Sequence, residues 1–344
     1  MREVKYLSPT SLALFESNPT EFYLKYLAEH RPPRLPQTEA MSVGAAFDAF
    51  VKNYLVYALH GKVEARFEIE AIFEEQVEPH NRDFAFDAGE YCFDCYRQSG
   101  ALANLMLELQ QAEGEPQFEF KIEQRVGLGN VVDGIPLLGK PDIYFRKPEG
   151  ARVIYDWKVN GYCSKSPVSP AAGYVMCRDS WNPETLAHSR SHGQQHKRAS
   201  LMNVGGIMIN IADGLETVKK DWATQLAIYM WILGEEVGTR AIVGIDQLCC
   251  APTSGSYPLI RVATHRCRVG EEFQRELEAR IVECWDVVNP VSPRYGWIFR
   301  NMTREENDDR CRILDSQYKA YQNPVDYHSN EEWEAWFQSE TRRW

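Results

Sequence analysis

Apolar residues recur every three or four positions along the first hundred residues, which is the spacing of one buried helix face. The clearest stretch covers residues 41–59, where Val43, Phe47 and Phe50 begin such a face. We therefore expect residues 1–115 to be helical.

The apolar period then changes from helical spacing to strict alternation. Residues 118–126 alternate apolar and polar side chains, which is typical of a half-buried strand. Asp133-Gly134 is a hairpin-turn signal. Strand-like segments follow at 135–145 and 152–159, so the pattern predicts three neighbouring strands in an antiparallel meander.

Residues 160–220 break this pattern, because they are rich in Gly, Ser, Pro and His and read as a long insertion. Beyond it the apolar spacing predicts a helix over 221–233, strands over 241–250 and 259–269, and a helix over 271–288.

The expected architecture is α/β, in three parts. A helical part over 1–115 precedes a core over 116–290, which contains the insertion 160–220, and a helical tail over 291–344 follows. Trp333, Trp336 and Trp344 in this tail would dock on a partner or pack back on the domain.

The composition narrows the class of protein. Of the 344 residues, 44% are hydrophobic and 12% aromatic, which fits a globular chain and excludes disorder. No apolar run is long enough to span a membrane and no secretory segment is seen. The nine cysteines, an odd count, are expected as reduced thiols in a cytoplasmic protein. A net charge of −11 argues against a basic coat for nucleic acid but leaves a local basic cleft open.

One short group of residues is a candidate catalytic site: Asp142, followed by Asp156-Trp157-Lys158. Asp156 and Lys158 are two positions apart on a predicted strand, so they project from the same face. Pairing with the preceding strand would place Asp142 beside Asp156. Two carboxylates suit Mg²⁺ or Mn²⁺, and the backbone carbonyl of Trp157 could complete the ligand set.

An ordinary structural reading competes with this one. Asp142 would then cap a turn, and Asp156 and Lys158 would form a surface ion pair. Against this reading, Asp156 interrupts an apolar strand, where a charge is costly unless it is paired or bound to metal.

Five sequence blocks in order resemble the PD-(D/E)XK nuclease superfamily, in particular its RecB-like and phage-exonuclease branch. They are the helix pair from Ser8-Pro-Thr-Ser to Phe22-Tyr23, the helix Gly44-Ala-Ala-Phe-Asp48, the hairpin Glu123 with Gly139-Lys-Pro-Asp142, the strand Ile154-Tyr-Asp156-Trp-Lys158, and the helix Gln225-Leu-Ala-Ile-Tyr229.

The resemblance implies a restriction-endonuclease-like core, a central mixed sheet flanked by helices, that hydrolyses DNA phosphodiesters without a covalent intermediate. Asp142 and Asp156 would be catalytic metal ligands and Lys158 the catalytic lysine. Gln225 and Tyr229 would line the active site or contact DNA, unless they are a buried amide and a core tyrosine.

The chain departs from the family pattern at two positions. Asp48 stands where the family has a metal-binding histidine, and we expect it to ligate as well, the alternative being a hydrogen bond within its helix. Asn18 stands where some members have the first cysteine of an iron–sulfur cluster, and no C-x-x-C follows the nuclease motifs; the one such motif, Cys92-Phe-Asp-Cys95, lies on a predicted helix without a second pair. We expect no iron–sulfur cluster and interpret the cysteines as buried thiols.

The insertion carries seven Lys/Arg against four Asp/Glu, so it is locally basic. Its candidate contacts to nucleic acid are Arg190, Lys197, Arg198, Lys219 and Lys220. Its three histidines, His188, His192 and His196, fit a solvated loop better than a metal site.

The combined reading is a Mg²⁺- or Mn²⁺-dependent DNA exonuclease of recombination, repair or phage DNA processing. A structure-specific endonuclease and a catalytically inert DNA-binding module with the nuclease fold are the alternatives. DNA is the expected partner. Because no helicase motif is present, single-strand-binding, annealing and helicase proteins are candidate partner proteins. Polarity, strand preference and oligomeric state stay open.

Overall fold

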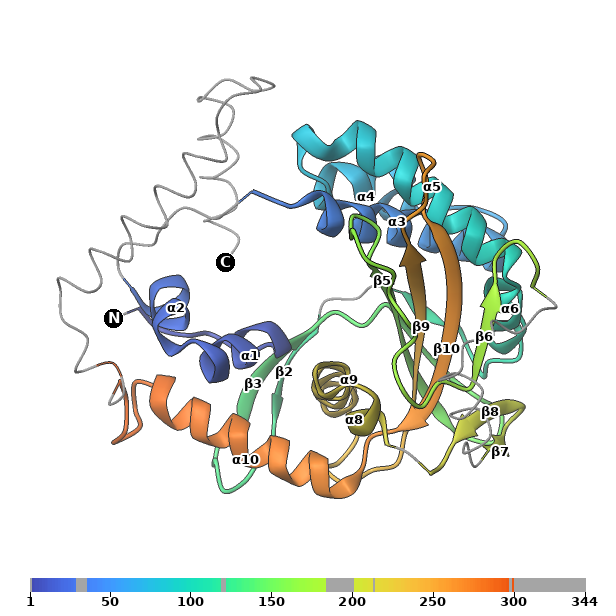
Figure 1. The fold of residues 1–344 in the computed structure, drawn as a ribbon. Coiled ribbons are helices and arrows are strands. Elements are labelled where there is room, and N and C mark those ends of the chain that lie inside the picture. Colours follow the sequence, from blue (N-terminus) through green and yellow to red (C-terminus); the bar gives the residue numbers. More distant parts are fainter. Residues whose placement is uncertain are drawn as a thin grey trace.

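A six-stranded mixed sheet forms the centre of the molecule (Figure 1). The computed structural model describes residues 2–28, 36–118, 122–183, 201–212, 214–296 and 299. In sheet order the strands are β1 (Gln117–Phe118), β4 (Ile143–Arg146), β5 (Arg152–Asn160), β9 (Ile242–Ala251), β10 (Leu259–Arg268) and β6 (Met176–Asp179). Strands β5 and β9 run parallel and the other neighbours antiparallel, so the expected mixed α/β core is confirmed.

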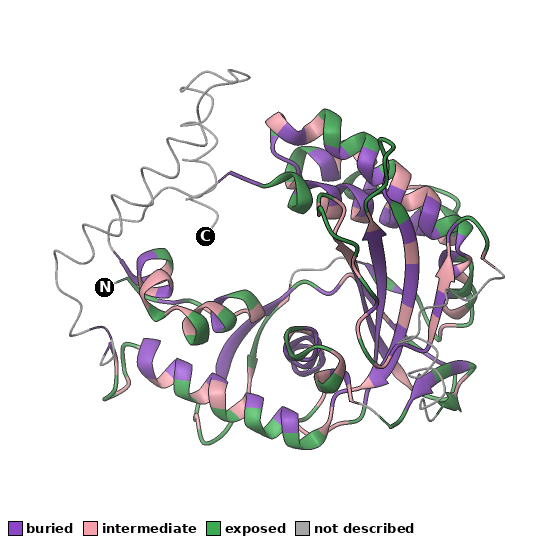
Figure 2. Cartoon of the chain, in the orientation of Figure 1, coloured by how far each residue is buried: buried purple, intermediate pink, exposed green. Residues whose placement is uncertain are grey.

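Helices cover both faces of this sheet (Figure 1). One face carries α3 (Glu39–His60), α4 (Ile69–Gln76), α5 (Arg82–Gln98) and α6 (Ala101–Gln110). The other carries α1 (Pro9–Ser17), α2 (Pro19–Phe22), α8 (Leu215–Val218), α9 (Lys220–Ile232) and α10 (Glu271–Val288). Short turns of π- or 3₁₀-helix lie at Tyr23–Leu27, Ala65–Phe67 and Pro79–Asn81. The central strand β9 is buried almost throughout because it is covered on both sides (Figure 2).

The alternation of side chains along β5 divides the core into two layers. Val153, Tyr155 and Trp157 pack with the cluster under α3 to α6. Ile154, between them in sequence, packs on the opposite face with α9 and α10. Asp156 and Lys158 share the face of Ile154, as their spacing predicts, and so they point toward α9.

The prediction of one antiparallel meander is wrong, because the chain changes sheets twice. The segment 135–145 is not one strand: β3 (Ile135–Gly139) pairs with β2 (Ile122–Val126) in a separate two-stranded sheet, whereas β4 joins the central sheet. The break falls at Lys140-Pro141-Asp142, where the proline has no N–H to donate to a strand ladder. Likewise, β1 and β2 lie in different sheets.

The insertion contributes more structure than its composition predicts. Strand β6 adds an edge to the central sheet by pairing with β10. Strands β7 (Leu201–Val204) and β8 (Ile207–Asn210) form a hairpin whose turn uses Gly205 and Gly206, both with positive φ. The pairing partners of β6 lie 82 to 88 residues further along the chain, so the local sequence pattern could not predict this strand.

The elements after the insertion follow the sequence closely, as α9, β9, β10 and α10 match their predicted ranges within two residues. Among the described helices, none combines the length and apolarity needed to cross a membrane. The predicted Trp-rich helix of the tail lies outside the described residues.

Candidate active site

Asp142 lies beside Asp156, as the sequence predicts, because of the register between β4 and β5. Ile143 pairs with Tyr155, which aligns the residue before β4 with the one after Tyr155. The two carboxyl groups lie close enough for each to shift the pKa of the other. The backbone N–H of Trp157 donates to Asp142 Oδ2 over 3.2 Å, so the strand itself also fixes this carboxylate.

Lys158 connects the carboxylate pair to helix α9. Its ammonium contacts Asp156 and donates to Gln225 Oε1 over 3.0 Å. Gln225 in turn donates from Nε2 to the Tyr229 hydroxyl over 3.0 Å. The i, i+4 spacing of Gln225 and Tyr229 places them on one helix face. The structure thus brings together all five predicted catalytic residues.

Gly139 explains how Tyr229 reaches this position. A Cβ at residue 139 would lie 2.7 Å from the Tyr229 ring and 2.9 Å from Ile232. A larger residue at the end of β3 would therefore push α9 away, and Gln225 with it. The glycine of the Gly139-Lys-Pro-Asp142 segment has a packing reason, separate from the chemistry of Asp142.

Helix α3 adds a residue that sequence reasoning missed. Lys52 lies one turn after Asp48; its ammonium contacts Asp48 and lies 3.2 Å from Asp142 Oδ1. Its side chain is 1% exposed, so this is a buried cation between two carboxylates. The i, i+4 spacing from Asp48 was the available signal, but only the tertiary structure brings Asp142 to it.

The carboxyl groups of the pair differ in their protonation. Burial works to raise the pKa of Asp142, but the nearby Lys52 ammonium, together with Asp156, Lys158 and the Trp157 N–H, lowers this pKa to about 2. Burial and the neighbouring Asp142 charge raise the pKa of Asp156 well above its ordinary value. Burial works against the charge of Lys158, yet Asp156 and Asp142 raise its pKa, so the ammonium stays charged.

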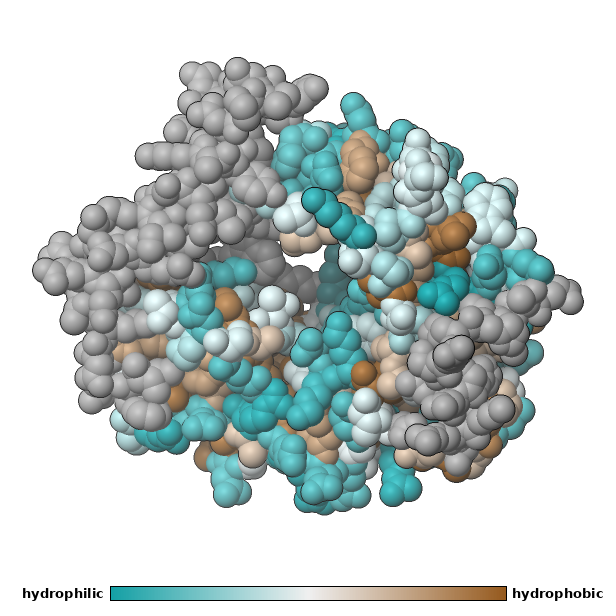
Figure 3. All heavy atoms as spheres, in the orientation of Figure 1, coloured by the Kyte–Doolittle hydropathy of each residue, from teal (hydrophilic) through white to brown (hydrophobic). Residues whose placement is uncertain are grey.

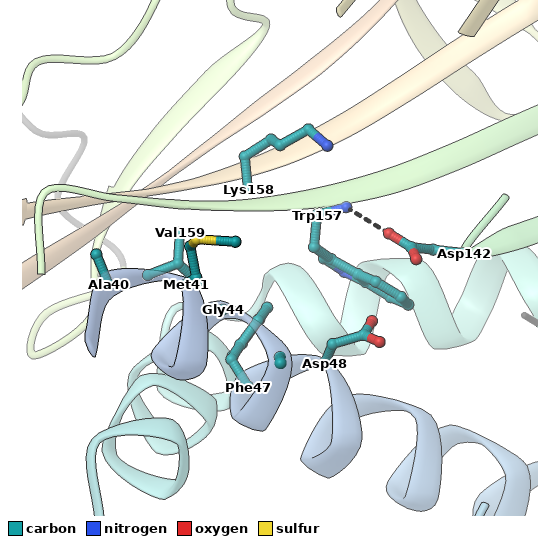
Figure 4. A pocket seen from close by; sticks show the side chains of 10 residues that line it. Ala40, Met41, Gly44, Phe47, Asp48, Asp142, Trp157, Lys158 and Val159 are labelled. Carbon is teal, nitrogen blue, oxygen red and sulfur yellow. Dashed lines mark hydrogen bonds between the residues drawn. The ribbon is translucent and has the colours of Figure 1, made fainter. Parts of the chain in front are cut away.

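An open cleft of about 500 Å³ leads to these groups. Figure 4 shows it between α3 and the end of β5, with Asp48, Asp142 and Trp157 toward one end and Lys158 opposite α3. In the view of Figure 3, the molecule is hollowed near the middle, between the part that holds α1, β2 and β3 and the part that holds α3 to α5. Asp142 and Lys158, which line the cleft, are therefore reachable from outside.

The carboxylates of Asp142 and Asp156 are suitable ligands for a hard divalent cation. Asp142 and Asp156 offer adjacent carboxylate oxygens, the ligand type that Mg²⁺ and Mn²⁺ prefer, and a bound cation would offset the repulsion that raises the Asp156 pKa. Within the described residues, no group of three or more His, Cys, Asp or Glu side chains is placed to hold one ion. Asp48 contacts Lys52 instead, so its role as a ligand, like that of the Trp157 carbonyl, stays a prediction.

A buried hydrogen-bond chain supports Trp157 from behind. Its indole Nε1 donates to the Tyr96 hydroxyl over 3.2 Å, and that hydroxyl donates to Asp246 Oδ2 over 2.6 Å. Thr264 and Arg266 also contact Asp246. These hydrogen bonds connect β5 to α5, β9 and β10, and so hold in place the strand that carries Asp156 and Lys158.

The predicted nucleic-acid contacts divide into two groups. Lys219 and Lys220 are exposed at the start of α9, two turns or less before Gln225, and the Lys219 ammonium lies over the Trp222 ring. Arg190, Lys197 and Arg198 lie outside the described residues.

Comparison with known protein families finds a match for the front part of the chain. Residues 6–171 match the PD-(D/E)XK nuclease superfamily, a stretch that includes Asp142, Asp156 and Lys158 but ends before Gln225. No curated protein matches the sequence. Among solved structures, one titled "Crystal structure of SSO0001" is similar, with 12% identity over 86% of this chain and 95% of that chain. Its TM-score of 0.24 is too low to carry an argument.

Proposed function

Residues 6–171 of this chain belong to the PD-(D/E)XK nuclease superfamily, and from this premise we propose that the protein is a divalent-metal-dependent DNA exonuclease. The membership supports the coarser statement, a nuclease-type hydrolase. Exonuclease action, Mg²⁺ or Mn²⁺ as the metal, and a role in recombination, repair or phage DNA processing are the proposal.

The observation that carries the proposal is the convergence of Asp142, Asp156 and Lys158 on one cleft. Two adjacent carboxylates beside a charged lysine suit the hydrolysis of a phosphodiester, whose transition state gathers negative charge on the phosphorus oxygens. A divalent cation held by the two aspartates would lower the pKa of an attacking water and neutralise phosphate charge.

The residues of the chain supply the remaining functions. Because its neighbours keep Lys158 protonated, it acts as a cation and hydrogen-bond donor to the phosphate or the attacking water, and not as the base that takes a proton. Gln225 holds the ammonium toward the carboxylates through its side-chain oxygen. Tyr229 holds the Gln225 amide in turn.

The test compares three end-labelled or closed substrates: linear duplex, linear single strand and closed circular DNA. Each is incubated with the full chain in Mg²⁺, in Mn²⁺ and in EDTA. Asp156→Asn is the test variant, since it removes a charge without changing the shape of the side chain. Asp94→Asn is the matched control, because Asp94 is an exposed carboxylate paired with Arg97 on α5.

We expect degradation of linear DNA only, lost in EDTA and in Asp156→Asn and kept in Asp94→Asn. Nicking of the circle would replace the exonuclease by an endonuclease. DNA binding without cleavage in either metal would favour the alternative that the protein is a catalytically inert DNA-binding module. Cleavage retained in Asp156→Asn would refute the assigned site.

A further inference from the structure

The cleft has two chemically different halves. Its inner half is lined by Asp48, Asp142 and Trp157, whereas the outer half is formed by Met41 and Gly44 of α3 and by Val159 of β5. Lys158 borders the cleft from β5, with its side chain directed to the opposite face of the strand, toward Gln225. Figure 4 shows Met41 beside Val159, on the side of the cleft away from Asp142. Among the described residues that line this outer half, none is charged. The two halves are continuous, so one bound molecule would touch both.

Gly44 has no reason within the fold to be a glycine. It lies inside α3 with helical backbone angles, where glycine is less favourable than alanine. A Cβ built on it would meet nothing within 4 Å among the described residues. Gly89 in α5 is the contrast, since its Cβ would lie 2.5 Å from that of Ala46, so helix packing demands a glycine there. What the bare backbone at Gly44 keeps clear is the cleft.

Met41, one turn before Gly44 on the same helix, has the character of a contact residue in this cleft. Its side chain is 56% exposed although it is large and apolar. Methionine is unbranched and polarisable, which lets it adapt to a planar ring laid against it. Val159, directly after Lys158 on β5, completes an apolar surface next to the reacting groups.

We propose that Met41, Gly44 and Val159 form a nucleoside subsite, which holds the sugar and base of a nucleotide adjoining the phosphate that is cut. The inference rests on the proposed function. A phosphate bound next to Asp142 continues into a sugar and a base, and the adjacent apolar half of the same cleft is where these would lie. With apolar side chains on this part of the cleft, the subsite would hold the base by apolar contact.

The first test fills the subsite by Gly44→Leu. We expect kcat/KM on a linear oligonucleotide to fall about tenfold or more, mainly through KM, while Tm stays level or rises. Ala58→Leu is the matched control, because it adds the same bulk at an exposed position of α3 outside the cleft. This control should leave both kcat/KM and Tm unchanged.

The second test removes the base instead of the space. Oligonucleotides with one abasic site, placed in turn at each nucleotide near the cut bond, are compared on the wild type and on Met41→Ala. At one position, we expect the abasic site to lower kcat/KM of the wild type about tenfold relative to the intact oligonucleotide. In Met41→Ala the same abasic site should cause no further loss, because the contact with the base is already missing.

The outcomes separate the two proposals. If the wild type degrades DNA, Gly44→Leu has the kcat/KM of the wild type, and every abasic oligonucleotide is cut as fast as the intact one, the nucleoside subsite is refuted. The proposed nuclease activity is then unaffected. If the wild type acts on no DNA in either metal, the nuclease fails and the subsite with it. A loss shared by Gly44→Leu and Ala58→Leu would assign the effect to α3 and overturn the subsite.

Discussion

Lys52 and Asp142, ninety residues apart in the sequence, form an ion pair of 3.2 Å that joins helix α3 to the strand break before β4. The ammonium is buried and also contacts Asp48. It is the largest favourable influence on the charge of Asp142. The fold thus holds one ligand of the candidate site ionised by a cation of its own.

Replacing this cation should destabilise the protein. Lys52→Met leaves Asp48 and Asp142 facing each other without the ammonium, and we expect a loss of about 2–4 kcal/mol in the free energy of unfolding. Urea denaturation in EDTA measures it, with Lys62→Met, an exposed lysine just past α3, as the control. Equal midpoints for the two variants would contradict a buried bridge.

The two aspartates should act on stability in opposite directions. The lowered pKa of Asp142 contributes stability above about pH 4 that is lost as pH falls toward 2. The raised pKa of Asp156 contributes stability at low pH that is lost as pH rises through that pKa. At pH 8 in EDTA, Asp142→Asn should therefore lower the free energy of unfolding by about 1–3 kcal/mol and Asp156→Asn should raise it, both measured by urea denaturation. Shifts of the same sign in both variants would refute this assignment.

The link from α9 to Lys158 should show in kcat. Gln225→Leu removes the acceptor of the Lys158 hydrogen bond at nearly constant volume, and we expect kcat to fall about ten- to a hundredfold with KM little changed. Single-turnover cleavage measures the effect. Tyr229→Phe, which touches Lys158 only through Gln225, should cost less, and a larger loss in Tyr229→Phe than in Gln225→Leu would invert the proposed order.

The hydrogen bonds that connect Trp157 through Tyr96 to Asp246 should stabilise the protein. Tyr96→Phe deletes one hydroxyl and leaves both the Trp157 indole and one Asp246 oxygen without it, which we expect to cost about 1–3 kcal/mol. Differential scanning calorimetry gives the loss. Tyr57→Phe, at an exposed tyrosine of α3, is the reference, and a Tyr96→Phe protein as stable as this reference would show that the network is dispensable.

Much of the site could be predicted from the chain because its residues are close in sequence or regularly spaced. The two-residue period of a strand puts Asp156 and Lys158 on one face, and the i, i+4 spacing of a helix does the same for Gln225 and Tyr229. Short connections also make β4 and β5 neighbours, which brings Asp142 to Asp156. Helices α3, α9 and α10 follow from apolar periodicity alone.

What only the tertiary structure decided involves partners that are far apart in the sequence. No local pattern tells that the chain leaves one sheet for another at Pro141, or that β6 of the insertion pairs with β10. Nor does it tell that Lys52 reaches Asp142, since a lysine on an amphipathic helix ordinarily faces water. Sequence by itself determined which residues share a face, because that depends on backbone period; the packing of distant elements decided which charges meet, and with that the protonation of the site.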